Sequence, residues 1–399
     1  MTHSSTSMIK NPGHFSISDR LRNALVVFAM IGVATFLAGL RVDPDRIWAS
    51  FLLNHFYFMS LGLGGIFFAS IQWVTGAMWS APVRRLSEAL SAYLPVVAVS
   101  FAILCFGIPH LYLWSHPQHV QGDLVLQGKS GYLSSGFFMV RNFLAIAIWL
   151  FLTHKMVRNS IAQDQDGNYK WTAKNRVLAP GFLILFGVTF TMASFDQLMS
   201  LDPHWFSTMF GIYCFSGLFY STLAAICLLT VYLKSRGKLD GIINENHFHD
   251  LGKFMFAFTV FWAYIAFSQF MLIWYANLPE ETGYFLHRFH GNWKGVSLFL
   301  LAGKFLLPFF ILLPREAKRC PTLLAWVGVF MLIAQWVDVL WMIQPEFFAE
   351  GPRVGWQELG VALGFLGVFG LAVFRFLAKN NIVAIGDPRL SESVFHHHQ

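Results

Sequence analysis

The sequence predicts an all-α, polytopic membrane protein of about ten transmembrane helices. Of its 399 residues, 56% are hydrophobic and only 12% are charged, whereas soluble domains carry roughly 25% charged residues. One aqueous core cannot bury so many apolar side chains, so lipid must be part of the solvent. Ten stretches also have the roughly 20 mostly apolar residues that a helix needs to cross a bilayer.

The ten predicted spans follow one another without a soluble domain between them. The first has Arg20 and Arg22 before it and lacks a cleavage motif, so we expect a retained helix rather than a signal peptide. The predicted spans are 23–40, 48–76, 89–108, 132–154, 177–198, 207–233, 252–276, 292–313, 322–343 and 356–377.

The distribution of Lys and Arg predicts the orientation, because basic loops stay in the cytoplasm. With both termini on one side, the loops of that side, Lys10 included, hold 20 of the 28 Lys and Arg residues, and the opposite loops hold six. The other two, Arg141 and Lys304, fall inside predicted helices. We therefore expect cytoplasmic termini, and we assign the net charge of +7 to topology and contact with acidic lipid rather than to nucleic-acid binding.

Two spans have related ends, which predicts an internal repeat. Asp196 precedes Pro203 by seven residues, and Asp338 precedes Pro345 by the same number. In the predicted helix before each of these two spans, a single basic residue lies among apolar ones: Arg141 in helix four and Lys304 in helix eight. We expect two related four-helix bundles, helices two to five and six to nine, flanked by helices one and ten. The predicted segments are a cytoplasmic tail (1–22), the first helix with its outer loop (23–47), the first bundle (48–206), the second bundle (207–345), the last helix (346–377) and a cytoplasmic tail (378–399).

The cysteines and histidines argue against a metal or haem centre in this chain. Only four cysteines occur, without a Cys-x-x-Cys pair, so c-type haem attachment is excluded and an iron-sulfur or zinc site is not expected. His55 has no second histidine at its depth in the membrane, which disfavours haem b. The run His396–His398 is interpreted as a tail.

A few ionisable residues inside the predicted helices are the candidate functional groups, because burying such groups in hydrocarbon costs several kcal/mol. Counted along the helices, each base lies about 10 Å further inward than the aspartate of its own bundle. That offset predicts bridging by water or polar groups rather than direct ion pairs. The buried ionisable residues are His55, Arg141, Asp196, Lys304 and Asp338, and the bridging candidates include Asn54, Asn142, Ser194, Tyr264, Ser268, Gln269 and Gln335.

Three interpretations of these residues are open. They form a hydrated half-membrane proton path that opens outward, or an outward pocket where a quinol hydroxyl gives its proton to a carboxylate or imidazole. The third interpretation is that the bases only tie helices together. Asp202 and His204, in the outer turn after helix five, join the functional set, although Asp202-Pro203 followed by Ser207 can also cap helix six.

Two long strings, residues 194–213 (SFDQLMSLDPHWFSTMFGIY) and 250–282 (DLGKFMFAFTVFWAYIAFSQFMLIWYANLPEET), carry a specific resemblance. They closely resemble the F subunit of bacterial alternative complex III, which belongs to the superfamily of polysulfide-reductase-type membrane subunits. The likeness extends over essentially the whole chain. Two positions depart from the pattern: Gln197 stands where an aromatic residue is common, and Lys304 where histidine is expected.

The resemblance implies a subunit of a quinol-oxidising complex in the bacterial inner membrane. Its implied partners are a homologous quinol-binding subunit, multihaem c-type cytochromes, an iron-sulfur subunit and a terminal oxidase. Haem c and iron-sulfur clusters then belong to partners, while quinone or quinol is the one cofactor this chain could contact. The F subunit is usually given a proton-conducting role, and the rival expectations are a catalytic quinol site in this chain or a purely structural anchor.

Overall fold

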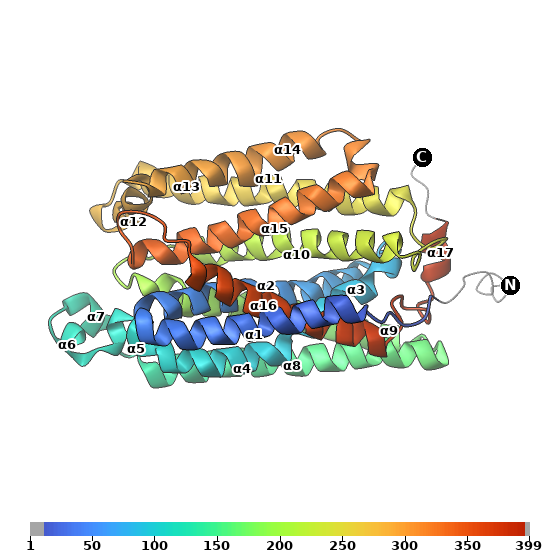
Figure 1. The fold of residues 1–399 in the computed structure, drawn as a ribbon, viewed down its shortest axis with the longest axis horizontal. Coiled ribbons are helices and arrows are strands. Elements are labelled where there is room, and N and C mark those ends of the chain that lie inside the picture. The colour runs from blue at the N-terminus through green and yellow to red at the C-terminus, as the bar shows by residue number, and fades with distance from the viewer. Residues whose placement is uncertain (1–11, 396–399) are drawn as a thin grey trace.

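The computed structural model describes residues 12–395, and it is helical throughout, without a strand among those residues (Figure 1). Within that range ten helices are long and apolar enough to cross a membrane. The predicted fold class, an all-α polytopic membrane protein, is therefore confirmed. Lys10 and the His396–His398 run lie outside the described residues.

The ten spans coincide with the predicted ones but are mostly longer, because polar residues continue several helices beyond the apolar stretch. The spans are α1 (Asp19–Val42), α2 (Pro44–Thr75), α3 to α5 (Ala81–Ser91, Leu94–Leu104 and Ile108–Leu111), α8 (Ser135–Asp166), α9 (Lys170–Gln197), α10 (Phe210–Ser235), α11 (Glu245–Ala276), α13 (Trp293–Phe299) with the π-helix η5 (Leu300–Leu306) and α14 (Leu307–Leu312), α15 (Pro321–Ile343) and α16 (Trp356–Lys379). The short helices are α6 (Pro117–Gln121), α7 (Leu124–Lys129), α12 (Pro279–Phe289) and α17 (Leu390–Val394).

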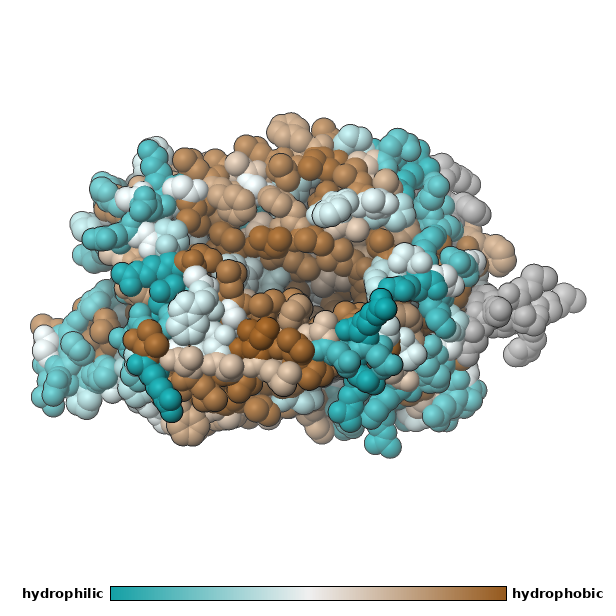
Figure 2. All heavy atoms as spheres, in the orientation of Figure 1, coloured by the Kyte–Doolittle hydropathy of each residue, from teal (hydrophilic) through white to brown (hydrophobic). Residues whose placement is uncertain are grey.

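On the face shown in Figure 2, an apolar belt crosses the middle of the molecule, with hydrophilic residues at both ends. Val33, Phe267 and Trp326 are each more than 60% exposed in this belt. Soluble proteins rarely expose contiguous apolar surface of this extent. The belt is the surface that lipid covers.

Helices α2 and α10 lie in the interior and touch each other. Helix α2 packs against α3, α4 and α9, and α8 packs against α4 and α9. Helix α10 packs against α11 and α15, which both contact η5. The relation of these two groups as a repeat remains a prediction.

The first and last spans, α1 and α16, cross at glycines. A Cβ atom added to Gly32 would lie 2.2 Å from the Cα of Gly364, and one added to Gly360 would lie 2.3 Å from the hydroxyl of Thr35. Such small residues let helix backbones approach closely in lipid, where packing rather than the hydrophobic effect holds helices together. The two flanking helices are thus joined to each other as well as to α2.

The two ends of the molecule differ. The described chain begins just before α1 and finishes just after α17 at one end of the molecule, which we call the proximal end, and α6, α7 and α12 lie at the opposite end (Figure 1). We call this opposite end the distal end; it is the one predicted to face outward.

Candidate functional site

The first of two buried ion pairs joins α8 to α9 in the distal half of the protein. Arg141 donates from Nη2 to Asp196 Oδ1 at 2.8 Å and from Nε to Oδ2 at 3.0 Å. The carboxylate also accepts a hydrogen bond from Asn142 Nδ2 at 3.1 Å. We call Arg141 and Asp196 the front pair. Because the arginine binds both oxygens of the carboxylate, the geometry is of the strong, bidentate kind.

The surroundings of the front pair explain how an arginine is held inside a membrane protein. The guanidinium lies 3.7 Å from the ring centroid of Tyr132 and 4.2 Å from that of Phe137. Its Nη1 donates to the backbone carbonyl of Tyr132 at 2.9 Å. Gln197 donates to Asn142 Oδ1 at 2.9 Å, so it extends the hydrogen-bond network around the pair.

The second ion pair joins the π-helix η5 to α15. Lys304 Nζ donates to Asp338 Oδ2 at 2.6 Å and to Gln335 Oε1 at 2.6 Å. The other carboxylate oxygen accepts a hydrogen bond from the hydroxyl of Tyr213 on α10 at 2.5 Å. We call Lys304 and Asp338 the rear pair. Both side chains are fully buried, and the ammonium also lies 4.2 Å from the ring centroid of Trp262.

The expectation that each base lies too far from its aspartate for direct contact is wrong. The reason is the direction in which side chains leave a helix, because every Cα–Cβ bond tilts toward the helix N-terminus. Helices α8 and α13 begin at the distal end, so Arg141 and Lys304 reach distally. Helices α9 and α15 begin at the opposite end, so Asp196 and Asp338 tilt toward the bases, and the long basic side chains close the remaining gap.

His55 lies apart from both pairs. On α2, its Nδ1 is 2.8 Å from the hydroxyl of Ser100, and the residue is 1% exposed. Its Nε2 is buried and has no hydrogen-bond partner among the described residues. The structure therefore brings His55 into the protein interior but connects it through Ser100 rather than to an acid.

Asp202 and His204 lie in the turn between α9 and α10, at the distal surface. Asp202 Oδ1 accepts from the backbone amide of His204 at 3.2 Å, so it stabilises its own turn. The alternative in which Ser207 caps the next helix is wrong: α10 begins at Phe210, its N-cap is Met209, and no side chain caps it. His204 Nε2 instead lies 2.5 Å from Asp123 Oδ2.

The contact between His204 and Asp123 predicts a pH dependence of the distal loop. The His204 hydrogen bond, helped by the amides of Val125 and Leu126, lowers the pKa of Asp123. A lowered folded-state pKa stabilises the fold above the ordinary aspartate pKa of about 3.9, and this stabilisation is lost as the pH falls through the lowered value. Hydrogen exchange of α7 amides, corrected for intrinsic rates, should accelerate only below about pH 4. In His204→Ala the acceleration should begin at a higher pH, and an unchanged onset would contradict the role of the histidine.

A pocket of about 540 Å³ at the distal end connects this turn with the front pair. Asp202, His204 and Glu280 line it, and so does Tyr132, whose ring stacks on Arg141. The ring of Tyr132 therefore lies between the front pair and a distal pocket that carries Asp202, His204 and Glu280.

Tyr264 and Gln269, two of the predicted bridging candidates, both lie on α11 but have opposite surroundings. Tyr264 is 63% exposed in the apolar belt, so the structure does not bring it to either pair. Gln269 is 4% exposed and lines a pocket of about 290 Å³ between α11, α12, α13 and α15. Tyr213, which binds Asp338, lines the same pocket.

Arg288, at the distal end, is one of the six Lys and Arg residues that the sequence analysis counted in the opposite loops, but it is fully buried in α12. It donates to the backbone carbonyls of Tyr284, Trp341 and Met342 and to Glu346. Tyr213 and Trp262, which contact the rear pair, were missed too. In a chain with 17% aromatic residues, no sequence signal distinguishes these two from other packing residues.

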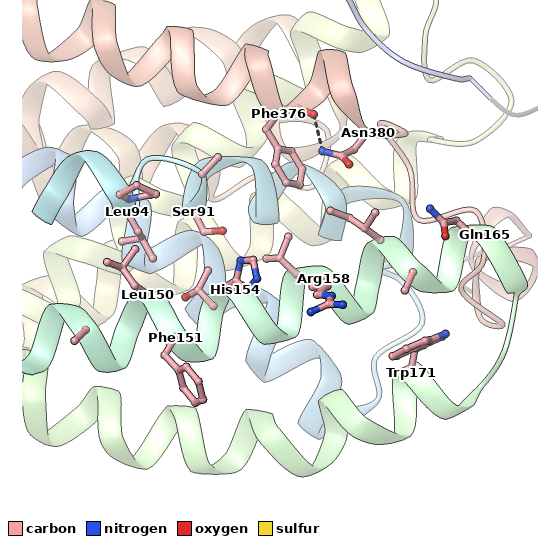
Figure 3. Close-up of a pocket in the computed structure, with 17 residues that line it drawn as sticks. Ser91, Leu94, Leu150, Phe151, His154, Arg158, Gln165, Trp171, Phe376 and Asn380 are labelled. Atoms are coloured by element: carbon pink, nitrogen blue, oxygen red, sulfur yellow. Dashed lines mark hydrogen bonds between the residues drawn. The ribbon is translucent and has the colours of Figure 1, made fainter. Parts of the chain in front are cut away.

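A larger cavity, of about 1060 Å³, lies toward the proximal end (Figure 3). It is lined by α3, α4, α8 and α16, with His154 and Arg158 on α8 and Asn380 beside Phe376. None of the residues that the sequence predicted for a functional site lines it. The candidate functional site is thus the distal region around the two ion pairs.

Comparison with known proteins gives no identification, because no family model and no curated protein sequence matches the chain.

Proposed function

We propose that the chain is a membrane subunit of a respiratory quinol oxidoreductase of the alternative complex III type. In this proposal it lies in the bacterial inner membrane with cytoplasmic termini and moves protons toward the outer side. The partners are those that the resemblance implies: a homologous quinol-binding subunit, multihaem cytochromes c, an iron-sulfur subunit and a terminal oxidase. Electron transfer then takes place on cofactors of the partners, and this chain supplies the ionisable groups.

The observation that carries the proposal is the presence of two buried base–carboxylate pairs in the distal half of a membrane protein. Ionisable side chains at such positions are rare and usually belong to ion pathways or proton relays. The front pair also lies next to Tyr132, which lines the distal pocket that carries Asp202 and His204. In this proposal a proton leaves Asp196 toward the outer side past Tyr132.

The rival function, a structural anchor, is favoured by the bidentate geometry of the front pair. Such a pair ties α8 to α9 whether or not protons pass. The two functions differ in what they predict when both charges are removed together. A structural pair replaced by two neutral polar residues is often tolerated, because no lone buried charge remains. A proton carrier cannot be replaced in this way.

Asp196→Asn is expected to lower the rate of proton release to the outer side by about 100-fold, the low end of what a positioned proton-transfer group contributes. The complex, with its partner subunits, is reconstituted into liposomes, and external acidification is measured against quinol turnover. In Asp196→Asn the charge of Arg141 has no carboxylate partner. The double variant Arg141→Gln/Asp196→Asn removes that charge as well, and it should release as few protons as the single variant. Asp166→Asn, partly exposed near the opposite end, is the control.

Two results would overturn the proposal. Unchanged proton yield and turnover in Asp196→Asn would remove Asp196 from the mechanism. Restoration of normal proton release in the double variant would show that the front pair acts only by holding the helices together.

A further inference from the structure

Three hollows at the proximal end share wall residues and form one groove. The largest is the cavity of about 1060 Å³ described above. It shares His154 and Arg158 with a hollow of about 820 Å³ between α8 and α9. It shares Phe376 and Asn380 with one of about 450 Å³ between α4 and α16. We call the three hollows together the proximal groove.

The wall of the proximal groove changes from apolar to basic along its length (Figure 3). Leu94 and Leu150 lie at one end of the cavity, and Arg158 lies further along α8. Ala147, which also lines the cavity, is eleven residues before Arg158 on α8, a distance of about 16 Å along the axis. Because this span is predicted to leave the membrane near His154, the apolar part lies at the depth of hydrocarbon and the basic part at the depth of lipid headgroups.

The basic part of the groove carries positive charge that no carboxylate of its wall balances. No Asp or Glu is among the described residues that line the three hollows. The two acids that follow on α8 are already paired, Asp164 with Arg85 and Asp166 with Lys170. The basic residues of the wall are His154, Lys155, Arg158, Lys174, Arg375 and Lys379.

The apolar and basic parts together define a ligand with a long apolar tail and an anionic head. Basic pockets between transmembrane helices on the cytoplasmic side are suited to anionic lipid headgroups, and guanidinium groups bind phosphate with two parallel hydrogen bonds. A free phosphate would use only the basic part of the groove. A zwitterionic lipid would bring a cation of its own among the Lys and Arg side chains, so its affinity should be lower.

We propose that the proximal groove binds one anionic phospholipid. Its phosphate lies at Arg158 and His154, and an acyl chain runs between α4 and α8 past Leu94 and Ala147. The other Lys and Arg residues of the wall add to the attraction without each touching the phosphate. The site lies at the end opposite the two ion pairs, and it does not depend on the proposed function.

The test is native mass spectrometry of the full chain in detergent, titrated with phosphatidylglycerol or with phosphatidylcholine of the same acyl chains. The chain should bind phosphatidylglycerol more tightly. Arg158→Gln should weaken the binding of phosphatidylglycerol about fivefold, the contribution of one cation near a headgroup, and should leave phosphatidylcholine unaffected. Ala147→Trp places an indole in the apolar part of the groove and should weaken the binding of both lipids.

Arg236→Gln is the matched control, because Arg236 is an exposed base just after α10 that lines none of the three hollows. It should bind phosphatidylglycerol normally, and the thermal unfolding temperature of each variant shows that the fold is retained. Equal affinity for the two lipids, or unchanged affinity for phosphatidylglycerol in Arg158→Gln, would overturn the inference. Competition by glycerol phosphate as strong as that by the lipid would show a site for free phosphate instead.

A partner polypeptide is the competing occupant of the groove. Phosphatidylglycerol with a diazirine in one acyl chain is therefore incorporated into membranes that hold the chain with its natural partners. Illumination should label the peptides of α4 and α8 around Leu94 and Ala147, and Arg158→Gln should reduce this labelling. If these peptides stay unlabelled while lipid-facing helices elsewhere react, another polypeptide fills the groove and the inference is wrong.

Discussion

Replacing Lys304 with methionine is expected to lower the free energy of unfolding by about 3–5 kcal/mol. The substitution keeps a long apolar stem but removes the ammonium that binds Asp338 and Gln335. The Asp338 carboxylate then stays fully buried with Tyr213 as its remaining donor. Breaking a buried pair by removing one partner is costly because the other charge has neither water nor a counter-ion.

The double variant Lys304→Met/Asp338→Asn is expected to recover most of that loss, because the asparagine is neutral and its carbonyl still accepts from Tyr213. Thermal unfolding of the chain in detergent measures both effects. Lys170→Met is the control, since Lys170 and Asp166 form a half-exposed pair of a kind that contributes about 0–1 kcal/mol. A loss below about 1 kcal/mol in Lys304→Met would show that the rear pair is not ionised.

Replacing Arg288 with methionine is expected to have an effect of similar size, about 3–5 kcal/mol. Its guanidinium is fully buried, lies 3.4 Å from the ring centroid of Tyr284, and binds the carbonyls of Trp341 and Met342 at the end of α15. The substitution leaves these carbonyls without their donor and leaves Glu346, which is 17% exposed, without its cation. Because Arg288 is the link between α12 and the end of α15, limited proteolysis should cut 277–292 faster in the variant.

Arg288→Lys should fail to restore stability, because an ammonium cannot reproduce the planar fork that bonds several acceptors at once. Lys294→Met, an exposed position at the same end, is the control and should be neutral. If Arg288→Lys instead had normal stability, the planar guanidinium would not be required, and a positive charge alone would explain the role of Arg288.

Much of the fold was predictable because lipid imposes one strong requirement, a run of apolar residues for each span. The helix ends were less predictable, since α8 and α11 continue into polar sequence that hydropathy does not count. Arg288 was misplaced for a related reason: the segment between two spans was expected to be in water, yet α12 folds back onto the protein and buries it.

The candidate site was predictable in its charges but not in its contacts. Arg141, Asp196, Lys304 and Asp338 stand out in apolar sequence, whereas their pairing depends on side-chain direction and reach, which a count of residues along an axis ignores. Of the two residues predicted on α11, Gln269 is buried and Tyr264 is exposed, and the reason is geometric. Each residue turns a helix by about 100°, so Trp262 and Gln269 share a face while Tyr264, two residues after Trp262, points to lipid.

Lys304 lies in a stretch of seven residues whose hydrogen bonds span five positions rather than four, which is the π-helical pattern of η5. Such a stretch holds one residue more than an ordinary helix of the same length needs. The surplus can in principle migrate along the chain while α13 and α14 keep their own bonding. A slip of one position would present Gly303 or Phe305 to Asp338 in place of the lysine, so the charge of this interior is set by local helical register as well as by composition.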